Sequence, residues 1–244
     1  MRNIKLTIEY DGTRYHGWQI QDNAETIQGV LKRAIKGLTG EETNLMGCSR
    51  TDVGVHALGQ IANFLTASTI PSDRFSYALN RMLPQDIVIN ASEEVSPDFH
   101  SRFMAKGKTY KYLIYNSQFP SAILRNRAYH VSHNMDLGLM RQAVEHIKGR
   151  HDFSAFRASG SDTKTSVRTI TALSLEQEGD TITMVISGDG FLYNMVRIIA
   201  GTLIEVGAGR LEPDDMQAII AGKDRKKAGR TAPAHGLYLM KIFY

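Results

Sequence analysis

The chain has 244 residues but only one cysteine, Cys48, and no long hydrophobic run. One cysteine can neither form a disulfide within the chain nor supply a zinc site built from several thiolates. The most apolar stretch, residues 195–207, is interrupted by Arg197 and Glu205, which argues against a membrane-spanning helix. The first ten residues alternate charged and apolar side chains, so they lack the apolar core of a signal peptide. These absences predict a soluble protein of the cytoplasm.

The common cofactor and metal motifs are missing as well. Residues 54–59 have the glycine spacing of a phosphate-binding loop, but Gln60 occupies the position where that loop requires lysine. Residues 188–190 lack the rest of a dinucleotide-binding fingerprint, and the eight histidines include no HExxH pair. We therefore do not expect a metal enzyme.

The overall composition is that of a globular protein, with 42% hydrophobic and 22% charged residues. The chain carries 29 basic and 25 acidic side chains, a net charge of +4 with histidine neutral. This excess favours an anionic partner but is too small to identify one.

The apolar residues recur in a pattern that predicts two successive groups of strands and helices. Alternation predicts half-buried strands, such as residues 4–10, and a spacing of three or four predicts helices, such as residues 26–38. The first group continues with a strand over 60–66, a helix over 73–83 and a strand over 86–91. The second group has a strand over 109–115, a helix over 136–148, a hairpin of strands over 169–176 and 181–187, helices over 191–206 and 213–221, and a strand over 236–243. This order predicts an α+β protein with two similar domains, residues 1–103 and 104–244, each a mixed or antiparallel sheet with helices on one face.

A polar segment from Cys48 to Gln60 contains the most distinctive combination of side chains. Arg50, Asp52 and His56 lie among small residues and glycines, which let a backbone turn tightly or approach a ligand. An aspartate beside an arginine stays ionised and can act as a nucleophile or a general base. The alternative is a structural turn in which Asp52 caps a helix and pairs with Arg50. Cys48 is expected to be a small buried residue, and His56 a hydrogen-bonded structural one.

A second segment, residues 102–112, contains four cations and no acid, with aromatic residues interleaved. This composition is typical of nucleic-acid surfaces, where cations contact phosphates and rings stack on bases. Tyr110 and Tyr112 share one face of the predicted strand, so one or both could line a cleft, whereas Lys111 points the other way. The alternative is a solvated basic face with a tyrosine in the core. A further basic cluster, residues 223–230, is interpreted as solvated surface.

A third segment, residues 189–201, places Arg197 among apolar neighbours on a predicted buried helix. Burying a guanidinium without a partner is costly, so Arg197 requires a carboxylate, and Asp52 is a plausible distant one. The alternative is that its charged end reaches solvent.

These segments together resemble the TruA family of tRNA pseudouridine synthases. The family's aspartate loop, G-R-T-D-A-G-V-H-A-x-G-Q, is similar to residues 49–60, with Ser49 and Val53 replacing the first glycine and the alanine. Four other family motifs are matched in order along the chain, at residues 10–12 with 17–19, 108–110, 191–197 and 232–239.

The resemblance implies isomerisation of uridine to pseudouridine at positions 38, 39 and 40 of the tRNA anticodon stem-loop. It also implies a homodimer of two-domain subunits, a basic cleft between the domains, and no metal or organic cofactor. Asp52 would be the catalytic aspartate, either attacking carbon or removing a ribose proton, and Arg197 would pair with it. The remaining residues would bind the substrate. Tyr110 would lie against the flipped base, and Arg50 would displace that base or replace it in the stack. Phosphates would be contacted by Lys106, Lys108 and Lys111.

Two other classes of function remain open at this point. A non-catalytic tRNA-binding or chaperone module would explain the cations and tyrosines. However, the carboxylate of Asp52 would then repel phosphate within the binding loop. A hydrolase using Asp52 with His56 would need no cofactor, but it would leave Arg197 without a role.

Overall fold

The computed structural model describes residues 1–160, 163 and 165–244. The chain forms two compact units, which we call unit 1 (Met1–Lys106 with Tyr238–Tyr244) and unit 2 (Gly107–Leu237). The α+β class agrees with the prediction. The predicted division at residue 103 assigned the whole C-terminal part to the second domain. The structure differs for Tyr238–Tyr244, because the last strand, β10 (Leu237–Phe243), pairs with β3 of unit 1.

Unit 1 is built on a sheet in which β4, β1, β3 and β10 are neighbours in that order, with β2 attached to β3. The central strand β1 (Arg2–Tyr10) is antiparallel to both β3 (His56–Thr66) and β4 (Ile87–Val95). The short β2 (Met46–Gly47) is antiparallel to β3, and β10 is parallel to it. The start of β10 therefore lies at the same end of the sheet as the start of β3.

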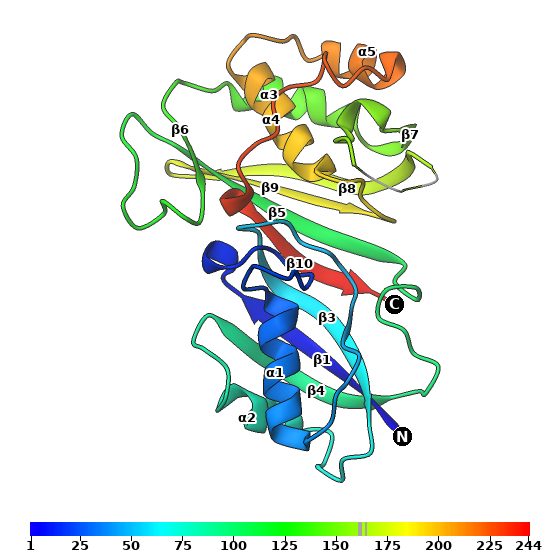
Figure 1. Cartoon of the computed structure of the whole chain (residues 1–244). Helices are drawn as coiled ribbons and strands as arrows, with labels where there is room; N and C mark the ends of the chain where they lie inside the picture. Colours follow the sequence, from blue (N-terminus) through cyan, green and yellow to red (C-terminus); the bar gives the residue numbers. More distant parts are fainter. Residues whose placement is uncertain (161–162, 164) are drawn as a thin grey trace. The chain divides into compact units, whose positions relative to one another are not determined.

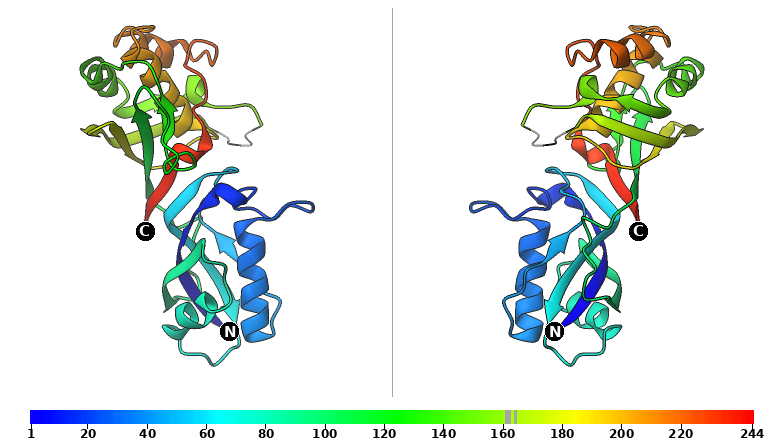
Figure 2. Two further views of the ribbon diagram at one scale, coloured as in Figure 1. Left: turned by 90° about the vertical axis from the view of Figure 1, so that its left-hand side faces the viewer. Right: turned by 90° about the vertical axis from the view of Figure 1, so that its right-hand side faces the viewer.

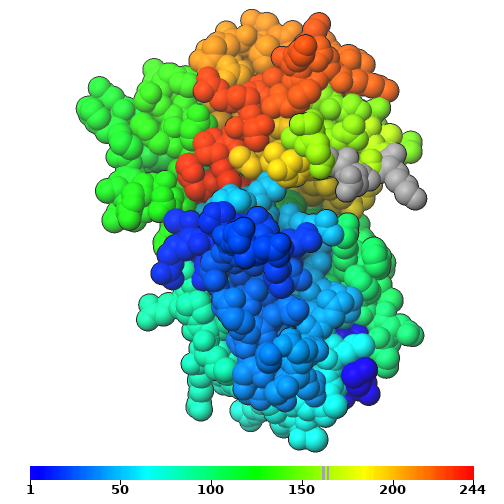
Figure 3. All heavy atoms as spheres, in the orientation of Figure 1, coloured from blue at the N-terminus to red at the C-terminus, as the bar shows by residue number. Residues whose placement is uncertain are grey.

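Two helices cover the apolar face of this sheet, and Figure 2 shows α1 running alongside it. The helix α1 (Ile27–Thr39) begins after Thr26, whose Oγ1 accepts the Gly29 N–H, and ends at Gly40 with φ +75°. The shorter α2 (Arg74–Asn80) places Phe75 edge-on against Phe64 of β3, with ring centroids 5.7 Å apart. A single turn of 3-10 helix, η1 (Gly12–Arg14), follows β1. In the space-filling view, α1 remains visible along its outer, polar side (Figure 3).

In unit 2, β5, β9, β8 and β7 are successive neighbours in the sheet, and β6 pairs in parallel with β5. Figure 1 shows its three helices on one face of this sheet. The inward side chains of β5 and β9, such as Tyr112, Met184 and Ile186, are buried beneath them. The bounds are β5 (Gly107–Asn116), β6 (Tyr129–Val131), α3 (Leu137–Glu145), β7 (Gly149–Asp152), η2 (Ser154–Phe156), β8 (Val167–Glu178), β9 (Thr181–Gly188), α4 (Met195–Gly207), α5 (Asp215–Gly222) and η3 (Ala234–Gly236).

The structure departs from the predicted elements at a few places. The helix α4 begins at Met195, four residues later than predicted, because Asn194 has a left-handed backbone with φ 60° and the preceding residues form a loop. The strand β3 begins at His56 instead of residue 60. The short strands β2, β6 and β7 were not predicted, since two to four residues are too few to show alternation. Within the described residues, no helix is both long and apolar enough to cross a bilayer.

Candidate active site

The loop that carries Asp52 connects β2 to β3, and a buried side chain fixes its first residues. Gln60, on β3, is fully buried. Its Oε1 accepts the Ser49 N–H at 3.2 Å, and its Nε2 donates to the Ser49 carbonyl at 2.6 Å. Gln60, which occupies the position where a phosphate-binding loop has lysine, therefore holds the backbone of Ser49 through two hydrogen bonds. We call this contact the Gln60 clamp.

The N-terminal segment fixes the middle of the same loop. The Tyr10 hydroxyl and Thr51 Oγ1 share a buried hydrogen bond of 2.7 Å, and the Trp18 N–H donates to the Thr51 carbonyl at 3.0 Å. Gly17 has φ +82°, and a Cβ there would stand 2.5 Å from the Thr51 carbonyl oxygen. A Cβ on Gly12 would stand 2.0 Å from the carbonyl oxygen of Val55. These contacts explain why the N-terminal motif accompanies the aspartate loop: its glycines allow the two backbones to touch.

With its backbone fixed, the loop leaves Asp52 half-buried and Arg50 exposed. The Val55 N–H donates to the Asp52 carbonyl at 3.2 Å, and Gly54, with φ +76°, completes a turn that leads directly into β3. No helix follows, so the alternative in which Asp52 caps a helix is wrong.

His56 and Cys48 have structural positions at the two ends of the loop, as expected from the sequence. The His56 ring is buried, its Nδ1 accepts the Gly12 N–H at 3.1 Å, and it stacks on Tyr238 at 4.7 Å between centroids. Cys48 is a buried thiol.

Arg197 occupies the first turn of α4 in unit 2. Its Nε donates to the Ala232 carbonyl and its Nη1 to Asn194 Oδ1, both at 2.8 Å. The Ala232 N–H returns a hydrogen bond of 3.1 Å to the Arg197 carbonyl. These two hydrogen bonds hold the half-buried guanidinium in one orientation.

The two tyrosines of β5 have different environments. Tyr112 is fully buried, its hydroxyl donates to the Pro233 carbonyl at 2.7 Å, and burial raises its pKa above the ordinary value. Tyr110 is only half-buried, and its ring meets Phe191 edge-on at 5.1 Å. Of the two tyrosines that share this strand face, Tyr110 is therefore the one available to a ligand.

The predicted lysines do not form one surface. Lys108 lies on the same face of β5 as Tyr110, whereas Lys111 points to the opposite face. Lys106 is exposed and is the last residue of the first segment of unit 1. Arg50 and Asp52 thus share one loop of unit 1, and Tyr110 and Arg197 belong to unit 2.

Several residues that shape the site were not singled out from the sequence: Gln60 and Thr51 beneath the loop, and Asn194 beside Arg197. Tyr10 and Gly17 lay within the resemblance, but their contact with the loop is visible only in the fold. Among the described residues, no group of three or more His, Cys, Asp or Glu side chains is placed to hold a metal ion.

Comparison with known proteins identifies the class of enzyme. A family model described as tRNA pseudouridine synthase matches residues 6–104 and 143–244. The chain is 66% identical to tRNA pseudouridine synthase A of Acetivibrio thermocellus, over 100% of both chains. It is 58% identical to the protein of that name from Ruminiclostridium cellulolyticum and 55% identical to the one from Caldicellulosiruptor saccharolyticus, again over 100% of each chain.

The chain therefore belongs to the TruA family of tRNA pseudouridine synthases, as the five motifs predicted. It is an isomerase that converts uridine to pseudouridine in tRNA.

Proposed function

We propose that this enzyme modifies uridines 38, 39 and 40 of the tRNA anticodon stem-loop in the cytoplasm, with Asp52 as its catalytic residue. The observation that carries the proposal is the construction of the aspartate loop. Its backbone is held at Ser49 and Thr51 by buried hydrogen bonds, while the Asp52 carboxylate stays half-exposed. A fixed backbone beneath an accessible carboxylate provides the preorganisation that catalysis requires.

The reaction places clear demands on the site. The target base is stacked in RNA, so it must be flipped out, which costs a few kcal/mol. The bond between N1 of uracil and C1′ of the ribose then breaks, the base rotates, and C5 bonds to C1′. The C5 proton is lost and N1 gains one, so the product is an isomer. Asp52 supplies the carboxylate at the reacting nucleoside.

Arg197 is proposed to pair with Asp52, holding its orientation and keeping it ionised. Support comes from Asn194 Oδ1 and the Ala232 carbonyl, which accept hydrogen bonds from the guanidinium and hold it in one orientation. Tyr110 would lie against the flipped base, since its half-buried ring is fixed by Phe191.

The exposed cations complete the proposed substrate contacts. Arg50, which is exposed in the aspartate loop, would occupy the space that the flipped base leaves. Phosphates would be contacted by Lys106, Lys108 and Lys111. Since Lys108 and Lys111 point to opposite faces of β5, they would contact different phosphates. We further propose that the enzyme works as a homodimer, which sedimentation of the purified chain would test.

The test is release of hydrogen from tRNA labelled at uridine C5, comparing the wild type with Asp52→Asn. Isomerisation must expel that hydrogen, whereas binding or backbone cleavage need not. We expect release by the wild type only, with tRNA binding by the variant kept within a few-fold. A tRNA with cytidine at positions 38, 39 and 40 is the control and should release nothing. Turnover by Asp52→Asn would remove Asp52 from the mechanism, and release from the control tRNA would overturn the positions.

A further inference from the structure

The segment after β4, residues 96–106, lies across the face of the unit 1 sheet that α1 and α2 leave open. Asn3 and Asn63 alternate with the inward-facing Ile4 and Phe64, so they belong to this second face, yet both are buried. Their Nδ2 atoms donate to the Phe99 carbonyl at 2.9 and 3.2 Å. The segment is therefore anchored to the sheet by buried amides.

The C-terminal residues anchor the same segment from its other side. The Lys106 N–H donates to the Phe243 carbonyl at 2.8 Å. The Tyr244 hydroxyl donates to the Ser101 carbonyl at 2.7 Å, and its ring lies 5.0 Å from that of Phe99. The backbone between residues 99 and 106 is thus fixed at several points, and its outward side chains have a rigid support.

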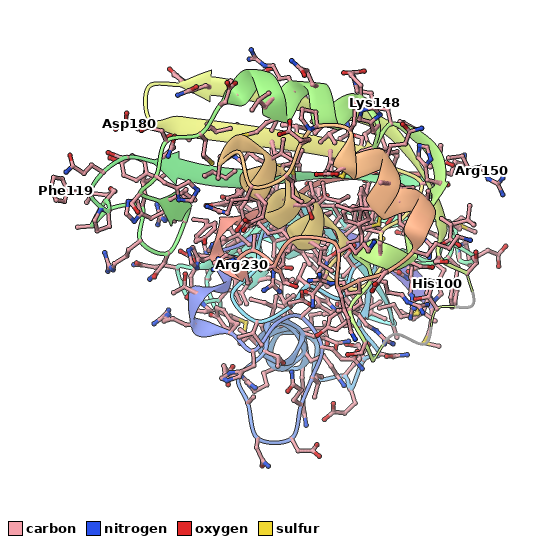
Figure 4. The ribbon with its side chains drawn as sticks, turned by 90° about the horizontal axis from the view of Figure 1, so that it is seen from above. His100, Phe119, Lys148, Arg150, Asp180 and Arg230 are labelled. Carbon is pink, nitrogen blue, oxygen red and sulfur yellow. The ribbon has the colours of Figure 1, made fainter. Side chains whose placement is uncertain are left out.

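Three side chains on this support form an exposed cluster, which we call the Phe103 platform: His100, Arg102 and Phe103. Phe103 is 77% exposed, with the His100 imidazole 4.2 Å from its centroid and the Arg102 guanidinium carbon 5.9 Å away. His100, labelled in Figure 4, is oriented by its own backbone, because its Nδ1 accepts the N–H groups of Arg102 and Phe103 at 3.1 and 3.3 Å.

The charge around the platform favours RNA over protein as its occupant. Residues 96–106 contain three basic side chains, His100, Arg102 and Lys106, and a single acid, the exposed Asp98. Beside them, Lys241 lies over the ring of Phe243 at 5.1 Å. An apolar protein surface would leave these cations without partners, whereas a nucleotide offers a base to the ring and phosphates to the cations. We propose that the Phe103 platform stacks on an unpaired base of the bound tRNA, with Arg102 and Lys106 on the neighbouring phosphates.

The platform lies far from Asp52 within unit 1. In β10, Tyr238 pairs with His56 beside the aspartate loop, and Phe243 follows five residues later. Five residues of strand span about 17 Å. The platform is thus a second contact for the same RNA, and it contributes to binding and not to the chemical step. This inference rests on tRNA as the substrate and is independent of the role of Asp52.

The first test is the Kd of the full-length protein for a tRNA transcript, measured by fluorescence anisotropy. Phe103→Ala should weaken binding roughly five- to 100-fold, the range for loss of one stacked base. Tyr77→Ala is the matched control. Tyr77 is 66% exposed and has Arg74 5.4 Å from its ring, but it lies on α2 and should change Kd less than twofold. In C5-hydrogen release, Phe103→Ala should raise KM and leave kcat within twofold.

A second variant detects stacking directly. The chain has one tryptophan, Trp18, and it is buried, so the indole in Phe103→Trp would be the exposed one. We expect tRNA to quench its emission in a saturable way and to leave the emission of Tyr77→Trp unchanged. Phe103→Trp should also bind tRNA as tightly as the wild type.

The salt dependence of tRNA binding distinguishes the phosphate contact of Arg102 from the stacking of Phe103. Arg102→Ala should lower the slope of log K against log salt by about one, while Phe103→Ala should leave the slope unchanged. The proposal is overturned if Phe103→Ala keeps the wild-type Kd and tRNA leaves the emission of Phe103→Trp unaltered. It is equally overturned if Phe103→Ala changes the sedimentation of the free protein, because the ring then belongs to a protein interface. An active Asp52→Asn would contradict the proposed catalyst but leave these binding results valid.

Discussion

The two units hold their key charged side chains in different ways. In unit 1 the backbone around Asp52 is fixed by Gln60, Tyr10 and close glycine contacts, and the carboxylate extends from that support. In unit 2 the guanidinium of Arg197 is itself held, by Asn194 and by the Ala232 carbonyl. Changes beneath the aspartate loop should therefore act through stability, while changes beside Arg197 should act on activity with little effect on stability.

The glycine contacts should show the largest effect. In Gly12→Ala the new methyl group would stand 2.0 Å from a backbone oxygen, which cannot move as a flexible side chain can. We expect the free energy of unfolding to fall by about 3 kcal/mol, measured in urea. Gly222→Ala is the control: its Cβ has nothing within 4 Å, so this helical variant should be no less stable than the wild type. Equal stabilities for the two variants would mean that the N-terminal segment does not constrain the loop.

The buried clamp should have the next largest effect. Gln60→Leu removes the partners of the Ser49 N–H and carbonyl inside the protein, and buried polar groups without partners cost 1–3 kcal/mol each before relaxation. We expect a loss of about 2 kcal/mol in urea and a lower kcat/KM, because the loop backbone is freed. Gln177→Leu, which loses one exposed bond to the Gly179 carbonyl, should change neither quantity appreciably. Full activity in Gln60→Leu would show that Asp52 needs no fixed backbone.

The sequence predicted the class of enzyme, but it did not predict the contacts that hold the site residues in place. Alternation and helical spacing located the main strands and helices, and the motif at residues 49–60 singled out Arg50 and Asp52. The clamp by Gln60 was not predictable, because it depends on which residues of β3 face the loop. The left-handed backbone of Asn194 was also missed, since local pattern favoured a helix through it. The placement of Tyr238–Tyr244 in unit 1 depends on parallel pairing with a strand about 180 residues earlier in the chain. The spacing of apolar residues identifies a strand but does not indicate which strand it pairs with.

Changes to Asn194, which accepts a hydrogen bond from Arg197, should lower activity more than stability. Asn194→Gly removes Oδ1 while allowing the observed φ of 60°, so it tests the hydrogen bond without adding strain. We expect kcat/KM to fall about tenfold, equivalent to about 1.4 kcal/mol, with stability within about 0.5 kcal/mol of the wild type. Asn194→Ala adds strain from positive φ and should lose both activity and stability. If the glycine variant keeps full activity, the hydrogen bond that Arg197 donates to Asn194 Oδ1 does not orient the guanidinium.

The smallest effect is expected at Asp152 of unit 2. Its carboxylate is held directly by neighbouring side chains, as the guanidinium of Arg197 is. Lys223 Nζ lies 2.8 Å from Asp152, and this lysine, with Ser154 and Ser166, holds the pKa of Asp152 well below its ordinary value. A lowered pKa in the folded state stabilises the protein above the unfolded pKa near 4, and that contribution is lost as the pH falls further. Asp152→Asn should therefore lower the free energy of unfolding by about 1 kcal/mol at pH 7, discounted for partial exposure, and the gap from the wild type should shrink below about pH 4. Asp180→Asn, in the exposed turn between β8 and β9, should show no such pH-dependent gap. A gap for Asp152→Asn that is constant from pH 7 to pH 3 would mean that the asparagine acts through packing and not through charge.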